Sequence, residues 1–229
     1  NLFKIWAIGG AIVLSVSLLF GVILTSGIRG KKFFRAVIYL PNLVSAVALA
    51  TMWLQYVYSS KFGLLKSILD AVGMHKLAET AWLDTDHKFG ALLFAYCFGM
   101  IGYHMLIWMS GIERISPELY EAATIDGANR RQTFFHIVLP LIAPTGGIIA
   151  ILCAINSLKV FDIVKTMTEG GPYYATDVIA TYVYRTAFSS EIGMPRLGYA
   201  SAAALFFGGA VIIIGILLNA MKDRLQKNV

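Results

Sequence analysis

Polar side chains recur on one face of two long apolar segments, a pattern that suits contact with a small solute. In the segment 89–112, two tyrosines and a glycine recur at +3 and +4 and share a helical face, and a tyrosine can stack on a sugar ring and donate a hydrogen bond. In the segment 141–164, four residues at i, i+3, i+4 and i+7 share one helical face, and the middle two are polar. Such a face is costly in a membrane unless it lines a cavity or packs in a bundle. The candidate residues are Tyr96, Gly99, Met100, Tyr103, Cys153, Asn156, Ser157 and Val160.

Other polar groups in these segments have simpler explanations. His104 lies in an apolar run, where it is either functional or satisfied by another helix. Lys159 and Asp162 are three residues apart and could pair with each other. The sequence brings no Ser/His/Asp set together and has no metal-ligand spacing, so an enzyme is not expected. Cys97 and Cys153 fall within apolar segments and are expected to be small buried hydrophobes.

A charged stretch at 118–140 separates the two apolar segments. A short helix is expected at Glu118–Ile125, with Glu121 near the positive end of the helix dipole. Gly127 allows a sharp turn that a side chain would resist. A second helix is expected at Asn129–Val138. On these residues alone, the hairpin could equally be a tight connection.

Long apolar runs decide the fold class. The 229-residue chain is 58% hydrophobic and 14% charged, whereas about a quarter of residues are charged in soluble domains. Its mean hydropathy is +0.70. We therefore expect an all-α integral membrane protein, a single transmembrane domain over 1–229. The expected spans are 2–28, 34–58, 89–112, 141–164 and 198–221.

The charges orient these spans. The net charge of +6 comes from Lys and Arg at the ends of apolar runs, which is the positive-inside pattern and argues against nucleic-acid binding. The basic cluster at 29–35 is expected in the cytoplasm, as is the loop 113–140. The segment 59–88 then lies outside, where its apolar spacing predicts a short amphipathic helix on the membrane surface. Pro41 is expected to kink the second span.

The hairpin resembles the cytoplasmic EAA loop of ABC-importer permeases. That resemblance rests on Glu121-Ala122-Ala123, Gly127 and Ile137-x-Leu139-Pro140 at fixed spacing. Further motifs resemble the sugar-import branch, of the maltose or glycerol-phosphate type, and the similarity extends nearly end to end. These motifs are Phe34-Arg35, Leu40-Pro41, Trp53, Phe161-Asp162, Met167-Thr168-Glu169-Gly170-Gly171-Pro172 and Gly198-Tyr199-Ala200-Ser201-Ala202.

The resemblance implies roles for the hairpin residues. Glu121 would pair with a basic residue of an ATPase, Ala122 and Ala123 would permit close packing, and Gly127 would hold the turn. Asp126 belongs to the same implied contact. The face of the second apolar segment matches the position at which maltose-type permeases contact sugar. The implied coupling residues are Glu121, Ala122, Ala123, Asp126, Gly127, Ile137, Leu139 and Pro140.

The resemblance also implies a function and partners. The chain would be a permease subunit of an ATP-driven importer in a bacterial or archaeal plasma membrane. It has no GxxxxGK[ST] loop, so ATP and Mg²⁺ would bind to two partner ATPase subunits and no cofactor to this chain. A second permease subunit, making a heterodimer, and an extracellular or periplasmic solute-binding protein would complete the assembly. That branch usually has one more helix upstream of Asn1, so the chain is expected to be shortened at its N-terminus.

Alternatives remain within and outside this class. The solute could be glycerol phosphate, phosphate or an amino acid in place of a sugar or oligosaccharide. An ion-coupled secondary transporter is less favoured, because Asp162 is the only acid well within an expected span and no inverted repeat is evident.

Overall fold

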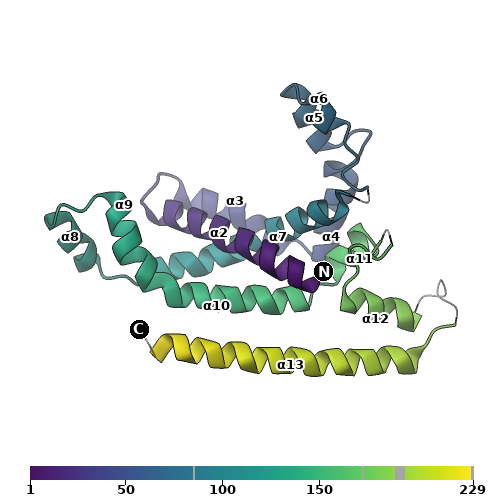
Figure 1. The fold of residues 1–229 in the computed structure, drawn as a ribbon. Helices are drawn as coiled ribbons and strands as arrows, with labels where there is room; N and C mark the ends of the chain where they lie inside the picture. The colour runs from purple at the N-terminus through teal and green to yellow at the C-terminus, as the bar shows by residue number, and fades with distance from the viewer. Residues whose placement is uncertain (85, 172, 189–193, 228–229) are drawn as a thin grey trace.

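The structure, a computed structural model, is built from helices that run side by side (Figure 1). It describes the backbone of residues 1–84, 86–171, 173–188 and 194–227, and the side chains of these residues up to 216. Within these residues, four helices are long and apolar enough to cross a membrane, and the number is five if a bent pair of shorter helices counts as one span. The charged hairpin lies at one end of the bundle, and the N-terminus at the other.

The first span is a continuous helix, Leu2–Thr25, which comprises α1 (Leu2–Lys4), a π turn (Ile5–Gly9) and α2 (Gly10–Thr25). It is followed by α3 (Lys31–Leu43), α4 (Ala46–Met52) and a second π turn (Trp53–Val57). Two short helices outside the bundle, α5 (Leu64–Ala71) and α6 (His75–Ala78), precede the long helix α7 (Lys88–Ile112).

The second half begins with the hairpin, α8 (Pro117–Ile125) and α9 (Arg130–Thr133). A π turn (Phe134–Val138) joins α9 to α10 (Leu139–Leu158), so that one helix extends from Arg130 to Leu158. The remaining helices are α11 (Asp162–Met167), α12 (Ile179–Phe188) and α13 (Leu197–Lys227).

The second predicted span, 34–58, is broken into two helices. The pair Lys31–Leu43 and Ala46–Val57 is bent by 100°. Pro41 lies inside α3, and the break follows it at Val44, which is extended (φ −80°, ψ 139°). Ser45 then starts α4 by accepting a hydrogen bond from the Ala48 N–H at 3.3 Å. The prediction of a kink was therefore right in kind, but the break falls three residues later and is much sharper.

The fourth predicted span, 141–164, is displaced toward the hairpin. Its helix begins at Arg130 and ends at Leu158. Lys159, at the C-terminal cap, suits the negative end of the helix dipole, and Asp162 begins α11 at a positive end. Among the described residues these two side chains form no ion pair, contrary to the pairing considered above. The first helix ends at Thr25 in place of residue 28, and α13 begins at Leu197.

The core forms where α7 meets its neighbours, and glycines make the closest contacts. A Cβ on Gly102 would collide with the Ile38 carbonyl oxygen and would lie 2.8 Å from the Tyr39 Cα of α3. A Cβ on Gly146 of α10 would lie 2.8 Å from the Trp108 indole. Helices in a membrane associate through such small residues, because lipid supplies no hydrophobic drive for their contact. The helix α13 packs on α10 and α12 and, over Leu197–Ile216, exposes most of its apolar side chains.

We predict that Gly102→Ala destabilises the protein by about 1–3 kcal/mol, because the obstructing atoms are backbone and cannot rotate away. The measurement is the midpoint of thermal unfolding in detergent. Gly90→Ala is the control on the same helix, since an added Cβ there meets nothing within 4 Å. Equal midpoints for the two variants would contradict the close crossing of α3 and α7.

Candidate functional site

The charged hairpin is closed by local hydrogen bonds. Ser116 caps α8 by accepting from the Glu118 N–H at 3.3 Å, and Pro117 takes the first turn. Asn129 and Gln132 form a capping box at the start of α9, with N···O distances of 2.8 and 2.9 Å. Gly127 has φ +73°, the left-handed region that favours glycine. The sequence therefore folds this hairpin from its own residues.

The tip of the hairpin exposes the residues expected to contact a partner. Glu121, Ala122, Asp126 and Gly127 are exposed, whereas Ala123 is buried in the hairpin itself. The tip also exposes an apolar residue that was not among the candidates: Ile125 is 85% exposed. The sequence did indicate this exposure, because Ile125 directly precedes the Asp126-Gly127 turn.

A π turn joins the hairpin to the long helix α10. The Leu139 N–H bonds to the Phe134 carbonyl, five residues back, and Pro140 follows without an N–H of its own. A widened turn of this kind accommodates the proline without ending the helix. Ile137 and Leu139 are half-buried here, and Pro140 is exposed.

A recess of about 410 Å³ separates the hairpin from the ends of the spans. Val22 and Thr25 of α2, Ile112 of α7 and Tyr120 of α8 line it, together with Val138 of the π turn. Burial raises the pKa of Tyr120 above its ordinary value. The hairpin thus touches the bundle at its edges and leaves free space beneath it.

A smaller pocket of about 210 Å³ lies toward the other end of the bundle, where α4, α7, α10 and α11 meet. Five of the eight solute candidates line this pocket: Tyr96, Gly99, Met100, Asn156 and Val160. Lys159 and Asp162 line it as well. The pocket therefore combines an aromatic face, an amide and two oppositely charged groups.

The other three candidates lie elsewhere. Tyr103 is 39% exposed on the outside of α7. Cys153 is buried, and its Sγ lies 3.7 Å from the Nε2 of His104. Ser157 is buried and donates to the Cys153 carbonyl at 2.7 Å. The histidine is satisfied by these surroundings, since its Nδ1 lies 2.8 Å from the Met100 carbonyl oxygen.

Asn42 fixes one wall of the pocket and was not among the predicted residues. Its Nδ2 donates to the Gly99 carbonyl at 3.1 Å, which ties the end of α3 to α7 beside the break. An asparagine directly after Pro41 in an apolar run was the available signal. Its partner lies 57 residues away, so the sequence alone did not identify it.

A buried ion pair holds the outer loop between α11 and α12. The Arg185 Nη2 lies 2.6 Å from the Asp177 Oδ2, and both side chains are nearly buried. Arg185 also stacks on the Tyr174 ring, and Gly170 leaves room for the carboxylate. Glu169, Tyr173 and Tyr174 have positive φ. Pro172, the last residue of the motif that begins at Met167, lies outside the described residues.

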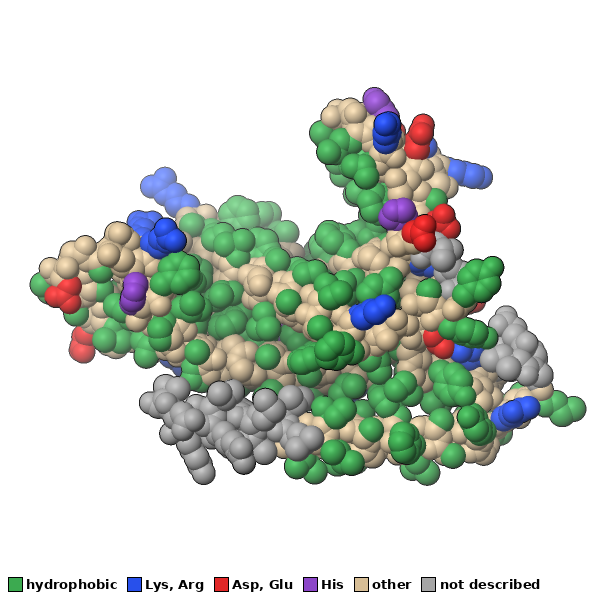
Figure 2. Space-filling model, in the orientation of Figure 1, with side chains coloured by type: hydrophobic (Ala, Val, Ile, Leu, Met, Phe, Trp, Pro, Cys, Tyr) green, Lys and Arg blue, Asp and Glu red, His purple; other side chains and the backbone are tan. Residues whose placement is uncertain are grey.

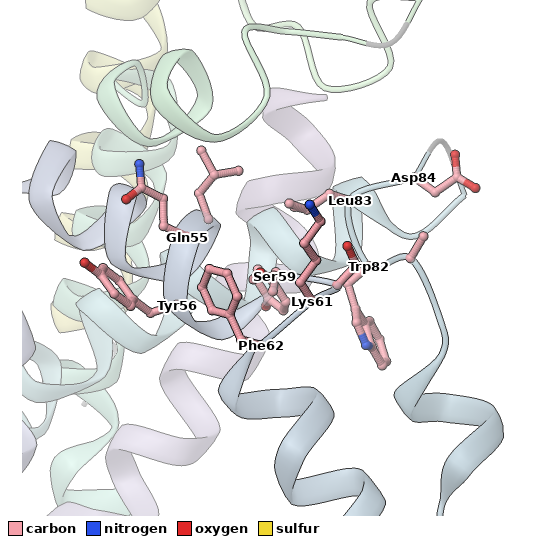
Figure 3. Close-up of a pocket in the computed structure, with 12 residues that line it drawn as sticks. Gln55, Tyr56, Ser59, Lys61, Phe62, Trp82, Leu83 and Asp84 are labelled. Carbon is pink, nitrogen blue, oxygen red and sulfur yellow. The ribbon is translucent and has the colours of Figure 1, made fainter.

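A third recess, of about 730 Å³, opens between the second π turn and the loops on either side of α5 and α6 (Figure 3). Phe62 and Lys61 extend toward Gln55 and Leu83, whereas Trp82 and Asp84 point in other directions. These groups do not converge on one point, so we assign no ligand to this recess.

Comparisons with known proteins place these features in a family. A family model described as "Binding-protein-dependent transport system inner membrane component" matches residues 17–229. A probable ABC transporter permease protein, YurN of Bacillus subtilis, is 32% identical over 200 residues, which are 87% of this chain and 65% of the relative. A probable starch degradation products transport system permease protein, AmyD of Thermoanaerobacterium thermosulfurigenes, is 35% identical over 91% of this chain and 69% of its own length.

The fold also matches a solved structure. A bacterial alginate ABC transporter, in complex with a periplasmic protein bound to alginate pentasaccharide, contains a chain with a TM-score of 0.86 and 24% identity. The match covers 99% of this chain and 77% of that one. The all-helical membrane fold class predicted from the sequence is confirmed.

Proposed function

Because this chain belongs to the family of binding-protein-dependent transport system inner membrane components, we propose that it is the permease subunit of an ATP-driven sugar importer. Membership confirms the resemblance recognised in the hairpin residues. The chain is thus a transport component of the membrane, and its location in the membrane agrees with its apolar helices.

One observation carries the proposal. A single helix, Arg130–Leu158, connects the exposed hairpin at one end to the polar pocket at the other. The hairpin offers Glu121 and Asp126 to a partner, and the pocket receives Asn156 from the last turn of the same helix. A movement of the hairpin would therefore move a wall of the pocket.

We infer the partners from the family to which the chain belongs. Two ATPase subunits would hold ATP and Mg²⁺ and would receive the hairpin, with Glu121 paired to one of their basic residues. A second permease subunit would complete the pathway, and a solute-binding protein would deliver the solute from outside. The chain itself would bind no cofactor.

A saccharide is the solute favoured by the pocket and by the relatives. Tyr96 offers an aromatic face, and the Asn156 amide offers both a donor and an acceptor to hydroxyl groups. The printed name of AmyD assigns starch degradation products to that relative. We extend this class of solute, a sugar or oligosaccharide, to the present chain.

We predict that Glu121→Ala weakens the productive contact with the ATPase roughly tenfold, which corresponds to about 1.4 kcal/mol. The reason is loss of an ionic contact at the exposed tip of the hairpin. The measurement is ATPase activity stimulated by the binding protein, together with sugar uptake, in the reconstituted complex. Glu113→Ala is the control, because Glu113 is an exposed acid outside the hairpin helices. If both variants coupled normally, the hairpin would be only a connection.

We predict that Asn156→Ala raises the KM of uptake for the transported sugar about two- to tenfold, the value of one hydrogen bond. ATPase stimulation at saturating sugar should persist, because the hairpin is unchanged. Uptake is measured over a panel of mono- and oligosaccharides. Ile148→Ala is the control, a half-exposed residue of α10 that lies outside the pocket. An unchanged KM for every transported sugar would exclude Asn156 from the solute site.

A further inference from the structure

The helices α5 and α6 form an arm that carries an uncovered apolar side. Leu64, Ile68 and Val72 recur every four residues and are 57%, 51% and 69% exposed. Leu77, in α6, is 44% exposed. The arm packs mainly on itself and on the second π turn, Trp53–Val57. No other described element buries this side of the arm.

The arm separates its apolar and charged side chains. Figure 2 shows hydrophobic side chains on the side of the arm that is turned back toward the hairpin end of the bundle, and Lys, His and acidic side chains on the opposite side. Some of these polar groups have partners within the arm: Lys66 donates to the Ser60 carbonyl at 3.1 Å, and the His75 Nδ1 lies 3.0 Å from the Asp70 Oδ1. Neither group needs a second protein for its charge.

The direction of the apolar side indicates what covers it. The spans run from the hairpin to the opposite end of the bundle, where the arm projects sideways (Figure 1). The arm lies at the outer end of the spans, and its apolar side is turned toward their cytoplasmic end. That side therefore faces the hydrocarbon of the outer leaflet. Apolar side chains are exposed on α3 and α4 as well, where Leu43 and Val47 are 67% and 51% exposed. A soluble protein approaching from outside would instead meet the charged side.

We propose that α5 and α6 form an interfacial lipid anchor, with Leu64, Ile68, Val72 and Leu77 seated at the boundary between headgroups and acyl chains of the outer leaflet. An amphipathic helix lies in this plane because its two sides have opposite solvent preferences. The second π turn joins the arm to α4, so the anchor would fix the depth of the broken span that lines the solute pocket. The inference rests on the membrane location of the chain and not on the identity of the sugar.

The test places a fluorophore on each side of the arm in the assembled transporter. Ile68→Cys places the label on the apolar side. Lys76→Cys is the matched control, because Lys76 is a charged and exposed residue of the same arm. The native Cys97 and Cys153 are buried. The labelled complex is reconstituted in phosphatidylcholine–phosphatidylglycerol vesicles, with or without lipids brominated near the headgroup end of the acyl chain.

We expect brominated lipid to quench the label at residue 68 severalfold more than the label at residue 76, and aqueous iodide to show the reverse order. Equal quenching of both labels by iodide would overturn the anchor and leave the arm in solvent. Protection of the residue 68 label from both quenchers would also overturn it, in favour of a protein partner such as the second permease. Neither outcome requires transport, so failure of the anchor would leave the proposed function standing.

Discussion

The fold depends on close backbone contact around α7. Hydrocarbon offers no hydrophobic drive for one apolar helix to leave lipid for another, so packing at short distance must hold the helices together. Glycines supply that packing: Gly102 leaves room for the backbone of α3, and Gly146 of α10 leaves room for the Trp108 ring. A Cβ added to Gly21 of α2 would lie only 3.0 Å from the Trp108 Cβ. These contacts hold α2, α3 and α10 against α7. The packing of these helices then determines where the hairpin and the pocket lie.

Within this packing, the helix Arg130–Leu158 is suited to transmit movement. It starts in a hairpin that is folded by its own caps and ends at a pocket lined by several broken elements. The break at Val44, the turn after Leu158 and the short helix α11 all meet there. Non-helical backbone at membrane depth is tolerated where it lines a cavity, and discontinuous helices are a common way to build a solute site in transporters. The architecture therefore joins a rigid helix, Arg130–Leu158, to a pocket whose walls are broken helices that can change conformation.

Local features of this protein were predictable from the sequence, whereas long-range ones were not. The hairpin helices, the Gly127 turn and the amphipathic helix α5 follow from caps, glycine and periodicity. The bend at Val44 was misplaced because its position depends on Asn42 reaching Gly99, 57 residues away. Likewise, Asn156 and Ser157 share one predicted face, but packing against α7 turns the first into the pocket and buries the second. The pair of Asp177 and Arg185 depends on a loop whose backbone no periodicity specifies.

The most direct test of this account is the distance between spin labels at the two ends of the long helix. Arg131→Cys and Lys159→Cys occupy exposed positions, and the native cysteines are buried. Pulsed electron paramagnetic resonance would measure the distance between the two spin labels in the assembled transporter, first without nucleotide and then with ATP trapped on its ATPase subunits. A helix of this length spans roughly 40 Å. The account predicts the same distance in both states, as for a rigid lever. Shortening with ATP would mean that the helix bends near Pro140 or Pro144 and that the hairpin's movement is absorbed before it reaches the pocket.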